Sequence, residues 1–400
     1  MSTSSTKSNQ ILTNKTAPRT GYLPSFDGWR ALAILGVLMT HDLPWAIAGH
    51  SNAAFKAAGG YGVALFFAIS GLLITTRILE EERIVGHFDI RRFYIRRLFR
   101  IQPVAILYLA VVGTLMVSHV IHDHWYYWFA AMFMFENFAW RPSLSPISFF
   151  EGHFWSLAVE EHFYILLSLL LLFLRKSRLA ALTALWILLF VATKIGEARG
   201  FFDPVITGRR TYWQLDFLIF AAMTALAIQR VNVRNWALRY GKPWMAFLAT
   251  LIAISLHRML VHLRHPTLHA FSLHGWLDEF GLVSQFFFTL WVAATMLHPE
   301  SWTTRLLELP LLRFIGKLSY SLYLWHVLFF SSFEPATNIT NPLLLVLSGR
   351  PEKYIASFAA AALSYYLLEK PMMRLGHRLA PPATPGRPEL MEQTAPAHEG

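Results

Sequence analysis

The stretch GWRALAILGVLMTHDLPW, from Gly28 to Trp45, decides the fold class because it has the character of a membrane helix. Its apolar residues extend over nearly the ~20 positions that a helix needs to cross the hydrocarbon core of a bilayer. The run nevertheless carries an arginine, Arg30, near its start and a histidine, His41, near its end. Ionisable side chains are costly inside a membrane, so these two residues indicate a functional site.

The composition of the whole chain agrees with a membrane protein. Of its 400 residues, 55% are hydrophobic and only 15% are charged, whereas soluble domains carry about a quarter charged residues. The chain has no cysteine, which excludes a thiolate nucleophile and a thiolate zinc site. Its net charge of +11 could suggest nucleic acid, but the charges lie between apolar segments rather than on a basic soluble arm. We therefore expect a lipid bilayer and no nucleic acid as partner.

Apolar segments recur along the chain and predict an all-α integral membrane protein with ten spanning helices. They lie near residues 29–48, 61–79, 103–121, 154–174, 179–196, 213–229, 243–260, 279–297, 313–333 and 353–369. An eleventh segment, WYYWFAAMFMFENF at Trp125 to Phe138, is aromatic and short. As a helix it would reach only ~21 Å, which favours a re-entrant or interfacial position.

The distribution of basic residues predicts the orientation. Most of the 35 Lys and Arg residues fall on one side when the ten segments alternate across the membrane, and that side should be the cytoplasm. Both termini are then cytoplasmic, and the first span is an uncleaved anchor. We expect a membrane domain over residues 23–378, between disordered tails at 1–22 and 379–400.

Arg30 and His41 cannot contact each other along one helix. They are eleven positions apart, or ~16 Å at 1.5 Å per residue. With Arg30 at the cytoplasmic boundary, His41 would lie somewhat past the midplane. Arg30 could also be a snorkelling helix-end anchor, and His41 a neutral imidazole bonded to a neighbouring helix.

The segment HFWSLAVEEHFY, His153 to Tyr164, opens the fourth span. Glu160 or Glu161, two turns below the entry, should reach a depth close to that of His41. A carboxylate beside an imidazole fixes its tautomer and raises its basicity, as a general base requires. The alternative is a helix-end carboxylate in contact with the outer loop, and the Glu-Glu-His order is not an HExxH metalloprotease motif.

Two further spans carry polar groups that we interpret as substrate lining. The ninth reads LSYSLYLWHVLFF and contains Ser319, Tyr323 and His326. Ser319 and Tyr323 share one helix face, because they are four residues apart. The second span places Ser70 among glycines that allow close helix approach or a narrow substrate passage. Such groups can also simply hold helices together.

The basic segment FYIRRLFRIQP predicts an anion site on the cytoplasmic side. Arg97 and Arg100 stand at i, i+3 spacing just before Pro103. Arginine binds phosphate bidentately, so a phosphate-bearing ligand fits here. Positive-inside anchoring or anionic lipid binding is the competing interpretation.

Acidic and histidine residues near the outer face allow weaker hypotheses. Asp216, near the outer end of the sixth span, could pair with Arg209 or Arg210, or bind an acceptor. Five histidines lie between His257 and His274, but their spacing fits no standard zinc pattern. We therefore expect no bound metal.

Taken together, these segments resemble the acyltransferase 3 family of bacterial membrane O-acyltransferases. They occur in the family's order from about residue 23 to 378, and the matching pieces are Arg30 with ten residues before His41, GVALFFAISGLLI, FYIRRLFRIQP, FWSLAVEEHFY with Trp155, LSYSLYLWH and EKP at Glu369 to Pro371.

The resemblance implies a multi-pass protein of the bacterial cytoplasmic membrane. It implies transfer of an acyl group, usually acetyl from cytoplasmic acetyl-CoA, to a hydroxyl of a glycan or another extracytoplasmic acceptor. His41 and Glu160 would be catalytic, whereas Arg30, Arg97 and Arg100 would serve the donor, with no permanently bound cofactor. His41 would act as general base or as a transient acyl carrier.

The chain departs from the family pattern near Asp216. An arginine and a glycine are frequent at the positions of Gln214 and Ala221, so the family role carries over less directly to Asp216. Two other function classes compete with the enzyme: a saccharide transporter or exporter whose His and Glu residues relay protons, and a structural membrane subunit. The acceptor, the acyl chain length and the oligomeric state are left open by the sequence.

Overall fold

The computed structural model describes residues 22–42, 46–47, 50–51, 53–139, 149–201, 209–262, 282–330 and 341–382. Within these ranges the chain is helical apart from two paired strands of two residues each. The elements are α2 (Pro24–His41), β1 (Ala46–Ile47), β2 (His50–Ser51), α3 (Ala53–Val85), α4 (Ile90–Val117), α5 (Trp125–Met132), α6 (Glu136–Ala139), α7 (Phe154–Phe173), α8 (Arg178–Ala198), α10 (Thr211–Ile228), α11 (Val231–Tyr240), α12 (Pro243–His262), α14 (Leu282–Leu297), α15 (Trp302–Leu307), α16 (Pro310–Phe329), α17 (Pro342–Leu347), α18 (Glu352–Ser364), the π-helical η4 (Tyr365–Glu369) and α19 (Lys370–Leu379).

The all-helical class predicted from the sequence is confirmed. The ten apolar segments coincide with α2, α3, α4, α7, α8, α10, α12, α14, α16 and the continuous pair α18 and η4. Five of the described helices, α3, α4, α7, α8 and α10, are long and apolar enough to cross a membrane. The count of ten and the cytoplasmic termini stay predictions, and the expected tails fall almost wholly outside the described residues.

The first apolar segment ends earlier than its sequence suggests. Apolar character continues to residue 48, whereas helix α2 ends at His41. Pro44 disfavours helical backbone at the residue before it, and the Asp42 side chain bonds groups on and beside α18. His41 therefore lies at the end of its helix.

The aromatic eleventh segment does not form a spanning helix. It divides into α5, of eight residues, and α6, of four. Met134, between the two, has a positive φ of 56°, which is a left-handed conformation that stops a helix. The segment is thus a pair of short helices, and its re-entrant or interfacial position stays a prediction.

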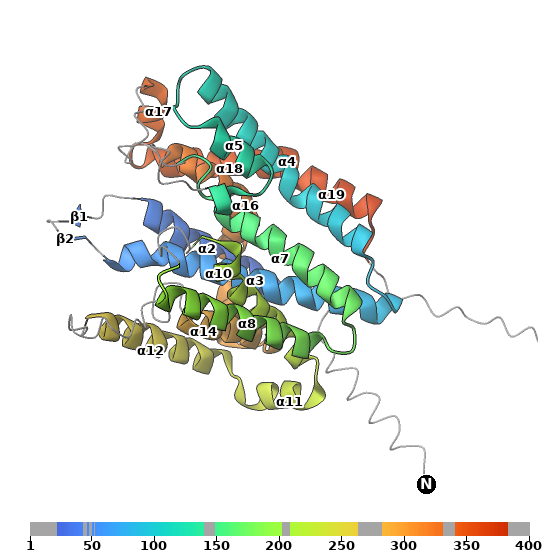
Figure 1. Cartoon of the computed structure of the whole chain (residues 1–400). Helices are drawn as coiled ribbons and strands as arrows, with labels where there is room; N and C mark the ends of the chain where they lie inside the picture. Colours follow the sequence, from blue (N-terminus) through green and yellow to red (C-terminus); the bar gives the residue numbers. More distant parts are fainter. Residues whose placement is uncertain are drawn as a thin grey trace, which may run out of the picture.

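Helix α2 lies at the centre of the bundle, between α3 and α16 (Figure 1). Glycines allow this close packing. A Cβ atom on Gly62 of α3 would lie 2.4 Å from the Ala33 carbonyl oxygen of α2. A Cβ atom on Gly316 of α16 would lie 1.8 Å from the Asp27 carbonyl oxygen. Both contacts require residues without a side chain, and they fix α2 against its two neighbours.

The two ends of the bundle differ (Figure 1). Strands β1 and β2 lie at one end, next to the terminus of α2. Helix α19 lies along α4 toward the opposite end. The chain therefore places the His41 end and the α19 end on opposite sides of the molecule.

Candidate active site

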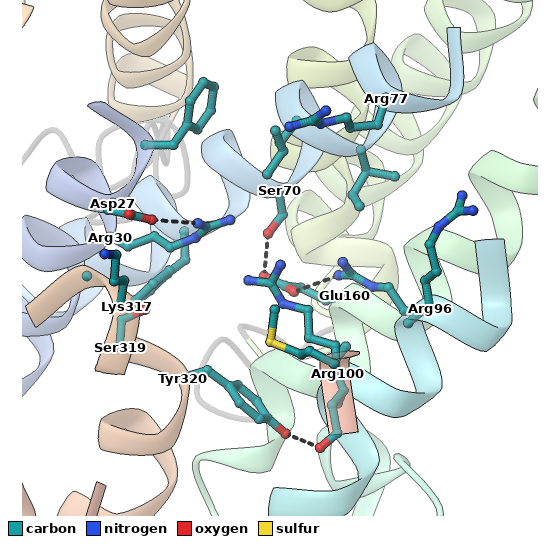
Figure 2. Close-up of a pocket in the computed structure, with 18 of the residues that line it drawn as sticks. Asp27, Arg30, Ser70, Arg77, Arg96, Arg100, Glu160, Lys317, Ser319 and Tyr320 are labelled. Atoms are coloured by element: carbon teal, nitrogen blue, oxygen red, sulfur yellow. Dashed lines mark hydrogen bonds and ion pairs between the residues drawn. The ribbon is translucent and has the colours of Figure 1, made fainter. Parts of the chain in front are cut away.

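A cavity of about 750 Å³ opens among α2, α3, α4, α7 and α16 (Figure 2). Its wall includes Met373 and His377 of α19, so it extends to the end of the bundle where α19 lies along α4. Ser156 of α7 and Tyr323 of α16 also line it. The cavity therefore leads from the α19 end into the interior of the helix bundle.

The three arginines selected from the sequence all line this cavity. Arg30 Nη1 lies 3.4 Å from Asp27 Oδ1. Arg97 Nη2 lies 3.6 Å from Glu160 Oε2, and the Arg97 guanidinium carbon is 3.5 Å from the centroid of the Tyr164 ring. Arg100 makes no hydrogen bond or ion pair with the part of the chain that the structure describes. The tertiary structure thus joins residues of α2 and α4 into one cationic wall.

The sequence analysis missed three more cations of this wall, which are Arg77, Arg96 and Lys317. Lys317 of α16 lines the cavity beside Ser319, as Figure 2 shows, and has no bonded partner among the described residues. Arg96 also lines it and bonds Glu81 at 2.5 Å. The signal for Lys317 was a lysine inside an apolar segment, which is as unusual there as Arg30 is in the first span.

Glu160 lies in the cavity wall and not beside His41, so the expected carboxylate–imidazole pair is wrong. Its Oε1 accepts a hydrogen bond from Ser70 at 2.9 Å, and its Oε2 accepts one from Tyr164 at 2.7 Å. Glu161 does not line the cavity. The reason is depth: Glu160 is seven residues, or ~10 Å, further along α7 than His153, which lies near the level of His41.

The residues expected to line a substrate site divide into three groups. Ser70, Ser319 and Tyr323 line the cavity. His326 lies beyond the cavity, against His41. Trp155 and Asp216 are not in the cavity wall: the Trp155 ring packs edge-on against Phe67, and Asp216 accepts a hydrogen bond from the next backbone N–H in α10.

Ser156 and Tyr323 form a hydrogen-bonded barrier at the inner part of the cavity. Their hydroxyl oxygens are 2.7 Å apart. The His153 backbone carbonyl lies 2.9 Å from the Tyr323 hydroxyl and 3.4 Å from the Ser156 hydroxyl, so it can accept a hydrogen bond from either one. This barrier joins α7 to α16 between the cavity and a group of histidines.

That group contains His41, His153 and His326, one from each of three segments that are distant in sequence. His326 Nε2 lies 3.1 Å from His41 Nδ1. The His153 and His326 ring centroids are 5.9 Å apart. His326 is fully buried and His153 is 6% exposed, whereas His41 is exposed. Sequence analysis did not select His153, although it begins the HFWSLAVEEHFY segment.

A cluster of charged groups holds the end of α2 beside these histidines. Asp42, which directly follows His41, accepts a hydrogen bond from Arg350 Nε at 2.9 Å. The same carboxylate contacts Lys353 and Tyr354, which belong to α18. Asp42 is 2% exposed and Lys353 is fully buried. The cluster therefore anchors the backbone next to His41 to α18.

No group of three or more His, Asp or Glu residues suited to a metal ion occurs among the described residues. The five-histidine segment considered from the sequence is described only over residues 257–262, at the end of helix α12, and its other three histidines lie outside the described ranges.

Comparisons with known proteins find one matching protein family and several similar O-acetyltransferases. Residues 23–369 match the protein family described as an acyltransferase domain. The chain is 28% identical over 404 residues to the O-acetyltransferase OatA of Staphylococcus aureus, covering 93% of this chain and 60% of OatA. It is also 28% identical over 396 residues to a Bacillus subtilis protein named "Putative peptidoglycan O-acetyltransferase YrhL", covering 89% of this chain and 56% of that protein.

A third relative, from Staphylococcus aureus strain COL and named "Putative O-acetyltransferase SACOL0978", is 30% identical over 331 residues. That match covers 76% of this chain and 50% of the relative. The chain thus spans between half and two thirds of the length of these relatives. No solved structure matches the chain. Because the family match extends over most of the described helices, the chain belongs to the acyltransferase 3 family.

Proposed function

We propose that the chain is an O-acyltransferase that moves an acyl group, most simply acetyl, from acyl-CoA to a hydroxyl of an extracytoplasmic glycan. The observation that carries this proposal is the cation-lined cavity that ends near a histidine pair. Tyr323, in the cavity wall, precedes His326 by one helical turn, and His326 contacts His41. In this proposal, a donor that enters the cavity meets the cations that bind its phosphates first and the histidine base last.

The donor would enter from the α19 end, with its phosphates near Arg100, Arg97 and Lys317. Arg100 and Lys317 have no described partner, and Arg97 Nε is buried without one. A phosphate is the ligand that best uses such unpaired donors. From there the thin pantetheine arm would extend toward the Ser156–Tyr323 barrier, which must open for the thioester to reach His41.

In the reaction that we propose, His41 takes the proton of the acceptor hydroxyl. The hydroxyl oxygen forms a bond to the thioester carbonyl carbon, and the carbon–sulfur bond breaks. The CoA thiolate leaves and receives the proton from the His41 imidazolium. Transfer through an acyl-histidine would use the same nitrogen as nucleophile.

Glu160 has a donor-side role in this proposal. It bonds Ser70 and Tyr164 and lies within ion-pair distance of Arg97. Both carboxylate oxygens are thus used in holding the cavity wall. Glu160 therefore serves as a positioning residue for Arg97 and not as the partner of His41.

The names of the relatives support a glycan acceptor, since one of them is named for peptidoglycan. An acceptor outside the cell requires His41 to face the outer side of a bacterial cytoplasmic membrane. The exposed His41, at the end of the bundle opposite α19, fits that arrangement. Acyl-CoA and bilayer lipid are the other partners that this function requires.

Inside-out membrane vesicles test the proposal directly. Vesicles with wild type, His41→Ala or the control His87→Ala receive acetyl-labelled acetyl-CoA, and both label in envelope glycans and free CoA are measured. His87 is exposed and outside the site. We expect wild type and His87→Ala to transfer label, and His41→Ala to lose at least ~100-fold of the rate.

Two results would overturn the proposal. Equal transfer by His41→Ala would remove His41 from the chemistry. No consumption of acetyl-CoA by wild type in the presence of envelope acceptors from the native organism would exclude acyl transfer and favour a transporter.

A further inference from the structure

The hydrogen-bond geometry around His326 determines where its ring hydrogen lies. Its Nδ1 is 2.7 Å from the Tyr323 carbonyl oxygen and 3.2 Å from the Leu322 carbonyl oxygen. A carbonyl oxygen can only accept, so Nδ1 must carry the hydrogen. In a neutral ring, Nε2 then has the lone pair.

His326 is best described as a neutral ring. It is fully buried, and its described neighbours are two backbone carbonyls and the rings of His41, His153, Tyr323 and Phe330. No carboxylate contacts it among the residues that the structure describes. A charged imidazolium would therefore be buried without a counter-ion, which is costly.

The contact with His326 also determines which nitrogen of the His41 ring carries the hydrogen. His326 Nε2, which carries a lone pair, lies 3.1 Å from His41 Nδ1, so His41 Nδ1 must donate. We propose that His326 is a positioning residue that holds His41 in the tautomer with the hydrogen on Nδ1 and the lone pair on Nε2.

This inference rests on the proposed function, because it names the atom that performs the chemistry. A general base needs its lone pair directed to the substrate and its other nitrogen held by an acceptor. Here a neutral histidine takes the place that the sequence analysis gave to Glu160. The Asp42 cluster fixes the backbone beside His41, while His326 fixes the ring, so both the position and the tautomer of His41 are defined.

Nitrogen NMR of the full-length protein in bilayers tests the tautomer without any enzyme assay. The chain is labelled with ¹⁵N-histidine, and the His41 signals are identified by their loss in His41→Gln. We expect Nε2 of His41 to resonate as an unprotonated ring nitrogen and Nδ1 as a protonated one. In His326→Leu, which removes the acceptor, a mixture of both tautomers should appear.

Kinetics of the same variants provide a second readout. In His326→Gln the amide oxygen can still accept from His41 Nδ1, so this variant should retain most of the transfer rate. His326→Leu should lower kcat ~100-fold, because loss of the partner that fixes a catalytic histidine is severe in a known triad. The donor Kd should be unchanged in both variants, since His326 lies outside the cavity.

The outcomes separate the inference from the proposed function. If wild type and His326→Leu show the same His41 tautomer, or if His326→Leu keeps the wild-type kcat, the positioning role is wrong although acyl transfer stands. If acetyl-CoA is not consumed while the NMR shows the expected tautomer, acyl transfer fails and the arrangement of the two histidines stands.

Discussion

Arg100 and Lys317 are cations in the cavity wall that form no hydrogen bond or ion pair with a described side chain. Their neighbours Arg30, Arg96 and Arg97 each have an acidic partner. Arg100 is half-buried and Lys317 is exposed, and a phosphate could accept charge-assisted hydrogen bonds from both. At the scale of single residues, these two side chains are therefore the ones whose loss should most affect the binding of an anion.

We predict that Arg100→Ala and Lys317→Ala each weaken the binding of CoA to the purified protein. A hydrogen bond to a charged group contributes about 1.5–3 kcal/mol, so each Kd should rise roughly 10- to 100-fold. Titration calorimetry in detergent measures this without an acceptor. The matched control is Arg305→Ala, whose side chain is 68% exposed and does not line the cavity. Unchanged affinity in both variants would contradict a phosphate site at this wall.

At the scale of elements, α2 is held by different interactions at its two ends. Near its start, the Asp27 backbone meets α16 at Gly316, where only glycine fits. At its far end, the buried Asp42 carboxylate contacts Arg350, Lys353 and Tyr354. Since Arg30 and His41 are both on α2, these two attachments set the distance between the cationic wall of the cavity and the histidines.

Asp42→Asn should destabilise the protein strongly. Asp42 is the buried carboxylate that Lys353 contacts, and removing one partner of a buried ion pair costs about 3–5 kcal/mol. The melting temperature of the detergent-solubilised protein should therefore fall, and transfer should fall with it as His41 moves. Glu300→Gln is the control, because its pair with Arg305 is exposed and contributes ~0–1 kcal/mol. Equal melting temperatures for the two variants would show that the Asp42 cluster does not anchor α2.

At the scale of the whole molecule, the arrangement predicts that the α19 end faces the cytoplasm and the opposite end faces outward. Arg378 of α19 and His119, just after α4, are both exposed. The helix α4 connects the two regions, because its start lies along α19 and its end is followed by His119. Any reagent that cannot cross the membrane should therefore distinguish them.

Cysteine labelling tests this orientation, since the natural chain has no cysteine. We expect a membrane-impermeant maleimide to label His119→Cys in intact cells and Arg378→Cys only in inside-out vesicles. The reverse pattern would place the cationic cavity on the outer side and would contradict a cytoplasmic donor. Labelling of both positions from one side would contradict an odd number of crossings between residues 119 and 378.

The sequence by itself determined the helical class, the segments that become the main helices, and three of the arginines that line the cavity. Apolar runs of about 20 residues and charged groups inside them are local signals, so they can be read without a structure. Only the tertiary structure decided which residues are partners. Glu160 faces Arg97 and not His41, because α2 ends at His41 and Glu160 lies two turns deeper on α7. His326 contacts His41 across 285 positions of sequence, and Lys317 shares a cavity with residues of other helices. Both relations depend on helix packing.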